Sequence, residues 1–128
     1  TPNYVVASGS ITVDTGNDLM TYTKVGRFVW LTGYSNISSV SSPSGTLYMD
    51  GAPFAAGGYT EGEHHSHIAF RWSYQSGDAG TLMSYISHAS NNIWIEYNDG
   101  QTTSNAAVGQ KMTSASAFLA GGGYATAS

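Results

Sequence analysis

Apolar residues in this chain recur at every second position, not at the 3.6-residue spacing of an amphipathic helix. In the run IAFRWSYQ, for example, Ile68, Phe70 and Trp72 alternate with more polar or smaller residues. Such runs are broken at short intervals by Gly, Asn, Asp, Pro or Ser, which is typical of antiparallel sandwiches and barrels. The pattern predicts an all-β, antiparallel fold, either a sandwich or a barrel.

The 128 residues are expected to form one domain spanning 1–128, because a chain of this length builds a single core. The strands predicted from alternation are 3–13, 18–25, 27–35, 45–50, 67–76, 81–88, 93–98 and 115–126. The polar, glycine-rich segments between them, at 36–45, 55–67 and 98–110, are expected to be loops.

The run RFVWLTGY is apolar on both of its faces. Val29 and Leu31 fall on one side of the predicted strand, and Phe28, Trp30 and Tyr34 fall on the other. Because one small domain has one core, the second apolar face predicts a partner surface. Alternation in TLMSYISH indicates a similar second face. The residues expected to contact other subunits are Phe28, Trp30, Met83 and Tyr85.

The exposed edges of the predicted sheet lack the usual protection. Open sheets blunt their edges with Lys and Pro, and this chain has only two Lys and three Pro. Either closure of the sheet or assembly with identical copies would cover such edges.

Composition excludes several kinds of partner. Charged residues make up 9% of the chain, against roughly 25% in an average soluble protein. The four basic residues cannot form a cationic stripe, so nucleic acid is not an expected partner. No apolar stretch approaches the roughly 20 residues that span a bilayer, so membrane insertion is not expected either. The chain has no cysteine, which removes disulfides and thiolate metal sites.

Three segments, YTKVGRFVWLTGY, SGTLYMDGAPF and the terminal FLAGGGYATAS, occur in an order and spacing that resembles the C-terminal modules of tailed-bacteriophage tail fibres and tailspikes. The resemblance implies an antiparallel, jelly-roll-like β-sandwich at the distal end of a fibre in the virion, usually a homotrimer, that often contacts a bacterial surface polysaccharide. The segment EGEHHSH lies outside the matching pattern, so the resemblance assigns it no role.

A glycan site needs an aromatic face for the sugar ring and polar groups for its hydroxyls. Trp94 falls on the polar face of the predicted strand 93–98, and this combination makes it the principal candidate. The predicted glycan-binding residues are Trp94, Asn92, Glu96, Asn98, Tyr48 and Tyr59. The alternative is that Trp94 is buried between subunits.

The segment EGEHHSH also allows a metal site. His65 and His67 lie two residues apart, so both imidazoles can face the same side, and three copies around an axis would supply six nitrogens for a transition-metal ion. Arg71, in phase with this pair, would repel a cation. The alternative is a polar loop that meets solvent or ligand, with no cofactor bound.

Catalysis is not expected, because no nucleophile elbow, cysteine nucleophile or P-loop is present. Glu61 and Glu63 have the residue type of a glycosidase pair but lie in one glycine-rich segment. We therefore expect a noncatalytic module that trimerises and binds a host surface glycan. Two alternatives stay open: a purely structural trimerisation clamp, and a monomeric carbohydrate-binding module of a secreted enzyme.

Overall fold

The computed structural model describes residues 2–57, 65–73, 81–101 and 103–127, without the side chain of Phe70. Its strands are β1 (Asn3–Val25), β2 (Phe28–Asp50), β3 (Ser66–His67), β4 (Phe70–Ser73), β5 (Thr81–Ile86), β6 (Ile93–Asn98), β7 (Thr103–Ser104) and β8 (Ala117–Ala125). A single 3-10 turn, η1 (Gly109–Lys111), is the one helical element of the described residues. No described helix is long and apolar enough to cross a membrane.

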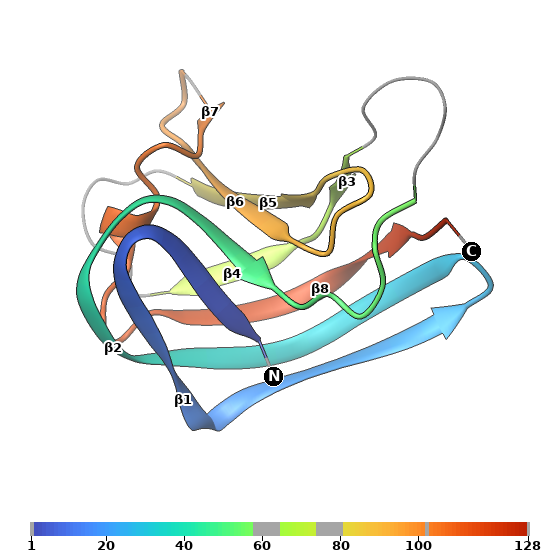
Figure 1. Ribbon diagram of the computed structural model, residues 1–128, viewed down its shortest axis with the longest axis horizontal. Coiled ribbons are helices and arrows are strands. Elements are labelled where there is room, and N and C mark those ends of the chain that lie inside the picture. The colour runs from blue at the N-terminus through green and yellow to red at the C-terminus, as the bar shows by residue number, and fades with distance from the viewer. Residues whose placement is uncertain (1, 58–64, 74–80, 102, 128) are drawn as a thin grey trace.

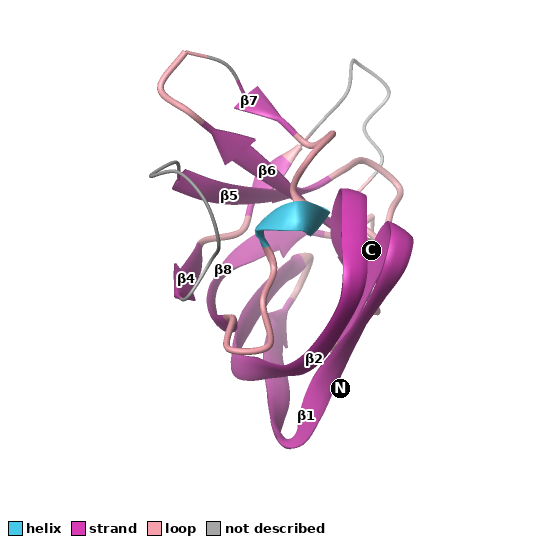
Figure 2. Cartoon of the chain, turned by 90° about the vertical axis from the view of Figure 1, so that its left-hand side faces the viewer, coloured by secondary structure: helices cyan, strands magenta, loops and turns pink. Residues whose placement is uncertain are grey.

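The described strands form one antiparallel sheet in the order β3-β5-β6-β2-β8-β4, with β1 and β7 paired to β2 and β6. The sheet curls strongly into a half-barrel, which brings β5 and β6 over β8 and the first half of β2 (Figures 1 and 2). The predicted all-β antiparallel class is confirmed. The described strands belong to one continuous curled sheet, and a division into two separate sheets is not seen in their pairing.

The two ends of this strand order, β3 and β4, are neighbours in the chain. Between them, the Ile68 N–H donates to the Ser84 carbonyl at 3.2 Å, and the Ala69 carbonyl accepts from the Gly121 N–H at 2.9 Å. The segment therefore ties the β5 side of the sheet to the β8 side. Among the described residues, β1 pairs with β2 alone, so its outer edge is the long open edge of the sheet.

Two pairs of predicted strands merge into two long ones. Residues 3–13 and 18–25 belong to β1, whereas 28–35 and 45–50 belong to β2, so the loop expected at 36–45 is wrong. The two strands form one bent hairpin whose register shifts at several points. Gly9 and Gly45 take positive φ values of 81° and 83° at these bends, where a Cβ on Gly9 would collide with the β2 backbone.

The remaining strand predictions differ mainly at their ends. The predicted strand 93–98 matches β6, and 81–88 and 115–126 overlap β5 and β8. The predicted strand 67–76 is divided instead between β3 and β4, because the chain there leaves β5 to pair with β8. Residues 74–76 lie outside the described residues. The segment 98–110, expected to be a loop, contains β7 and part of η1.

The core fills the inside of the curl. Val29 and Leu31 reach it from β2, and Ile93 and Ile95 reach it from β6, all at most 3% exposed. Beside them, the rings of Tyr4 and Phe118 stack with centroids 4.5 Å apart. The core thus separates the outward side chains of the β1-β2-β8 layer from those of the β5-β6 layer.

Two buried phenols carry polar atoms into this core. The hydroxyls of Tyr4 and Ser35 lie 2.6 Å apart in a hydrogen bond, and the Tyr124 hydroxyl donates to the Phe54 carbonyl at 2.8 Å. Burial raises the pKa of both phenols, and the hydrogen bonds offset only part of that rise. Both tyrosines therefore stay neutral in the folded protein at physiological pH.

Candidate functional site: two outward surfaces

The first candidate surface covers the outward side of β1, the first half of β2, and β8. We call it the apolar face, and its residues are Leu19, Val25, Phe28, Trp30, Tyr34 and Leu119. Leu19 and Val25 are 70% and 72% exposed, and Phe28 and Trp30 are 48% and 46% exposed. Large apolar side chains gathered on one exposed face mark an interaction surface.

Strand register explains why these residues share one face. Val25 pairs with Phe28, and Tyr34 pairs with both Leu19 and Leu119 across neighbouring strands. In β8 the outward positions between them are glycines: the Phe28 ring lies over Gly123, and a Cβ on Gly121 would meet no atom within 4 Å. The face therefore exposes strand backbone beside its aromatic rings, and predicted interface residues Phe28 and Trp30 both lie on it.

A groove of about 540 Å³ lies at the Tyr34 end of the apolar face. The Tyr34 hydroxyl donates to Asn36 Oδ1 at 2.7 Å, and Arg71 and Asp14 contribute opposite charges to the lining. The Asn17 side-chain amide and the Gly16 N–H both donate to the Asp14 carboxylate, which lowers its pKa.

The second candidate surface crosses the outward side of the other layer. We call it the aromatic row, and its residues are Tyr48 of β2, Trp94 of β6, Tyr85 of β5 and His67 of β3. Trp94 pairs in register with both Tyr48 and Tyr85, and Tyr85 pairs with His67. The Tyr48 and Trp94 ring centroids are 4.9 Å apart at an interplanar angle of 48°.

A pocket of about 240 Å³ opens at the β3 end of the aromatic row, lined by His65, His67, Tyr85 and Glu96. The His65 ring meets the Tyr85 ring edge-on, with centroids 4.9 Å apart. Glu96 lies two residues beyond Trp94 on the same outward face of β6 and pairs in register with Met83. The pocket thus combines one carboxylate, two imidazoles and an aromatic ring.

The structure brings together some of the predicted glycan residues and not others. Trp94, Glu96 and Tyr48 lie on one surface, whereas Tyr59 lies outside the described residues. Asn98 is engaged in a turn: its Nδ2 donates to Thr103 Oγ1 at 2.9 Å, and its Oδ1 accepts from the Gly100 N–H at 2.8 Å. Asn92 is half-buried at the start of β6.

Met83 and Tyr85, predicted with Phe28 and Trp30 as subunit contacts, lie on the other layer. Met83 is half-buried, and Tyr85 is half-buried beside Trp94. The predicted interface set is thereby divided between the apolar face and the aromatic row.

The predicted metal ligands His65 and His67 do lie together, in the pocket beside Glu96. Within the described part of the chain, however, no group of three His, Cys, Asp or Glu side chains has an arrangement that could hold a metal ion. Arg71, expected in phase with these histidines, lies on β4 and lines the groove of the apolar face instead. Glu61 and Glu63 lie outside the described residues.

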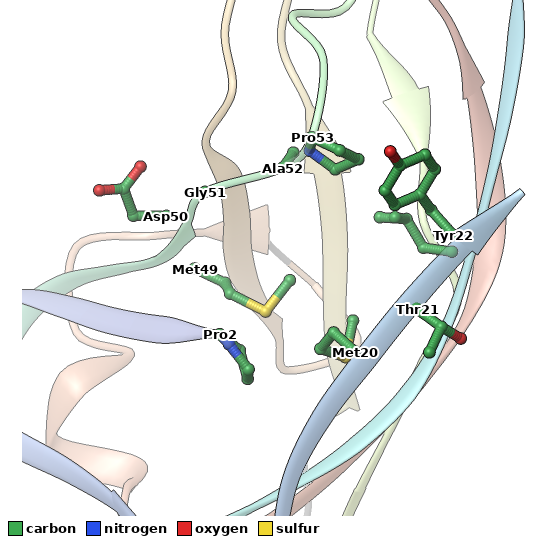
Figure 3. Close-up of a pocket in the computed structure, with 10 residues that line it drawn as sticks. Pro2, Met20, Thr21, Tyr22, Met49, Asp50, Gly51, Ala52 and Pro53 are labelled. Atoms are coloured by element: carbon green, nitrogen blue, oxygen red, sulfur yellow. The ribbon is translucent and has the colours of Figure 1, made fainter. Parts of the chain in front are cut away.

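A third cavity, of about 180 Å³, lies beside the end of β2 (Figure 3). Its walls are Pro2, Met20, Thr21, Tyr22, Leu31, Met49, Asp50, Gly51, Ala52 and Pro53. The Met20 and Met49 side chains dominate the wall, and the Asp50 carboxylate points away from it in Figure 3. This cavity offers few polar groups to a sugar and is the weakest of the three candidates.

Tyr85 of β5 and His67 of β3, which continue the row beyond Trp94, were not predicted from the sequence as its neighbours. Alternation did place Tyr85 and His67 on outward faces, but their position beside Trp94 depends on the strand order β3-β5-β6. Because side chains alternate along a strand, the sequence does show that Trp94 and Glu96 share a face of β6, and that Met83 and Tyr85 share a face of β5. Pairing adjacent strands would have joined these two sets.

No protein-family model and no curated protein matches this chain. Its curled, all-β antiparallel architecture is nevertheless found in a tailspike protein. The crystal structure of the Dettilon tailspike protein (gp208) matches 98% of this chain with a TM-score of 0.80 and 23% sequence identity. The chain spans 22% of the length of that protein. The match supports the sequence resemblance at the level of the fold, and a C-terminal position stays a prediction.

Proposed function

We propose that this chain is a noncatalytic module of a bacteriophage tailspike or tail fibre, that it joins three identical chains in the virion, and that it binds a bacterial surface polysaccharide. The jelly-roll-like sandwich and the C-terminal position expected from the sequence belong to the same proposal. The fold shared with a tailspike protein supports the virion context. The exposed apolar face is the observation that carries the assembly part.

The apolar face has the features of a protein interface. Trp30 and Phe28 are large aromatic residues, the type that dominates binding energy when a partner covers it, and both are nearly half exposed in the single chain. Their centroids lie 6.3 Å apart, so one partner surface can cover both rings. Burying them against identical copies would remove apolar area from water, at roughly 25 cal/mol per Å².

The open edge of β1 supports the same assembly. Within the described residues β1 pairs only with β2, and Leu19 and Val25 of the apolar face lie on this edge strand. Unprotected edges of this length invite pairing with another chain unless something covers them. Contacts at the apolar face would cover the edge strand as well.

The glycan part of the proposal rests on Trp94. Its ring stands beside Tyr48 on a face that also carries Glu96, the combination of aromatic surface and hydrogen-bond acceptor that sugar binding requires. Because the aromatic row and the apolar face lie on opposite sides of the core, assembly leaves the row accessible. Three weak sugar contacts would then act together and multiply the affinity of one.

Light scattering tests the assembly. We expect the wild-type chain at micromolar concentration to have about three times the 13.4 kDa mass of one chain. The double variant Phe28→Ser/Trp30→Ser should have the mass of a single chain, because two hot-spot side chains are removed from each interface. A monomeric wild type would refute the trimer and favour the monomeric carbohydrate-binding module.

Tyr22→Thr is the matched control. Tyr22 is 52% exposed, also aromatic, and lies on the opposite face of β1, where it pairs with Leu31 and packs edge-on against Phe54. This variant should remain a trimer.

A pull-down with host cells tests the glycan part. A wild-type trimer that binds no bacterial polysaccharide there would leave the purely structural clamp as the function.

A further inference from the structure

We infer that the aromatic row and the pocket beside it form one binding site for a saccharide chain without acidic groups, which runs across the strands from Tyr48 to His67. This inference rests on the proposed glycan binding and extends it to β5 and β3. It gives Tyr85, His65 and His67 a role in sugar contact, in place of subunit contact and metal binding.

The register fixes the length and direction of the site. Tyr48, Trp94, Tyr85 and His67 occupy paired positions on four consecutive strands. Neighbouring strands are about 4.8 Å apart, so the row spans roughly 14 Å at right angles to the strands. A surface of that length, with a ring on each strand, accommodates more than one sugar residue along a polysaccharide.

The rings are held in place before any ligand arrives. Tyr48 packs against Trp94 at 4.9 Å, and His65 meets the Tyr85 ring edge-on at the same centroid distance. Tyr48, Trp94 and Tyr85 are half-buried, so each presents part of its ring to solvent while the rest is packed. Preordered rings lower the entropy that a bound sugar must otherwise offset.

Polar groups suited to sugar hydroxyls lie directly beside the rings. Glu96 lines the pocket with Tyr85 and can accept hydrogen bonds at both carboxylate oxygens. His67 is exposed, lines the same pocket and offers one donor and one acceptor when its imidazole is neutral. A few convergent polar groups at the end of an aromatic platform determine which sugar fits.

The charges near the site determine the class of sugar. Asp50, two residues after Tyr48 in β2, and Glu96 place carboxylates on the outward side of this layer. Lys24 on β1, Arg27 in the β1-β2 turn and Arg71 on β4 lie elsewhere in the fold. Lys111 of η1 lies 4.5 Å from the ring centroid of Tyr97, which packs against the core on the side of β6 opposite Trp94 and Glu96. An acidic sugar would meet repulsion from these carboxylates with no lysine or arginine on the outward side of this layer to offset it, so the site favours uncharged sugars.

A glycan array tests the inference with the assembled protein. The probes are neutral hexose oligosaccharides, N-acetylhexosamine oligosaccharides and uronate-containing oligosaccharides at equal density. The wild type should bind members of the two uncharged sets and should bind the uronates measurably more weakly. Trp94→Ala should weaken that binding roughly 30-fold, as loss of a central aromatic contact does. His67→Ala should weaken it roughly fivefold.

Glu96→Gln keeps the shape of the side chain and removes its charge. This variant is a separate test of the site, whatever the folding of the Trp94→Ala protein. It should raise binding of the uronate probes roughly fivefold. Tyr22→Thr, an aromatic loss outside the row, should bind as the wild type does. Thermal unfolding of each variant shows that the compared proteins are folded.

The outcomes separate this inference from the proposed function. Wild-type binding to uncharged probes that Trp94→Ala and His67→Ala both leave unchanged would overturn the site, while the proposed glycan binding would stand. Binding to uronates alone would overturn the ligand class. A wild-type trimer that binds no probe, and no host-cell polysaccharide in the pull-down, would overturn both.

Discussion

The apolar face and the aromatic row both place aromatic side chains on outward positions of β2, but they hold these side chains differently. Trp30 is 46% exposed, and its ring centroid lies 6.3 Å from that of Phe28. Trp94 is half-buried, and its ring lies 4.9 Å from that of Tyr48. The first pair projects into solvent, whereas the second is already packed.

The surroundings of the two pairs differ as well. Glycines of β8 lie beside the apolar face, so exposed backbone adjoins its rings, and its outward side chains are largely apolar. The aromatic row instead ends in a pocket that contains Glu96 and two histidines. One surface is suited to broad contact with another protein, and the other is suited to a ligand that needs both a ring face and hydrogen bonds.

Raising the pH should destabilise the core between the two surfaces, where Tyr4 is buried. The pKa of Tyr4 is raised above its ordinary value of 10.0 by burial, so the folded state retains a proton that the unfolded state loses. The stability from this group is fully present below pH 10 and declines as pH rises above it, by about 1.4 kcal/mol per pH unit. Urea unfolding at pH 8 to 12 measures the decline.

Tyr4→Phe is the matched variant for this measurement. It removes the titrating hydroxyl, so its stability should fall less steeply above pH 10, although loss of the hydrogen bond to Ser35 should lower its stability at pH 8. Equal slopes for the two proteins would mean that Tyr4 is accessible to water. The two surfaces would then not be separated by a dry core at this point.

Trp94 should contribute more than Trp30 to the free energy of unfolding of the single chain. Trp94→Ala should lower the free energy of unfolding by about 2 kcal/mol, less than a fully buried tryptophan, because the ring is half-buried against Tyr48. Trp30→Ala should change it by about 0.5 kcal/mol or less when measured in dilute, monomeric protein. Urea denaturation measures both, and a larger loss from Trp30→Ala would contradict the difference in packing.

The two aromatic pairs, Tyr48 with Trp94 and Phe28 with Trp30, should also differ in the coupling free energy between their rings. A double-mutant cycle on Tyr48 and Trp94 should give a coupling free energy of about 1 kcal/mol, the usual value for packed aromatic pairs. The same cycle on Phe28 and Trp30 in monomeric protein should give roughly half of that or less, since their rings are farther apart. Equal couplings would mean that the apolar face is as preorganised as the aromatic row.

The sequence predicted which side of a strand is buried better than it predicted where the strands begin and end. Alternation in RFVWLTGY correctly separated buried Val29 from exposed Trp30. The Ser-rich segment 36–45 has little β propensity of its own, so its strand character comes from the long pairing with β1, which no local pattern reveals. Nonlocal pairing also explains why the contact between His65 and Tyr85 was not foreseen.

We propose that the apolar face, and not the aromatic row, assembles the chains. Light scattering on Trp30→Ser and Trp94→Ala, both confirmed as folded, measures this at one protein concentration. Trp30→Ser should have the mass of a single chain, and Trp94→Ala should have the mass of three chains. A trimeric Trp30→Ser together with a monomeric Trp94→Ala would contradict it, because the row would then be the subunit interface.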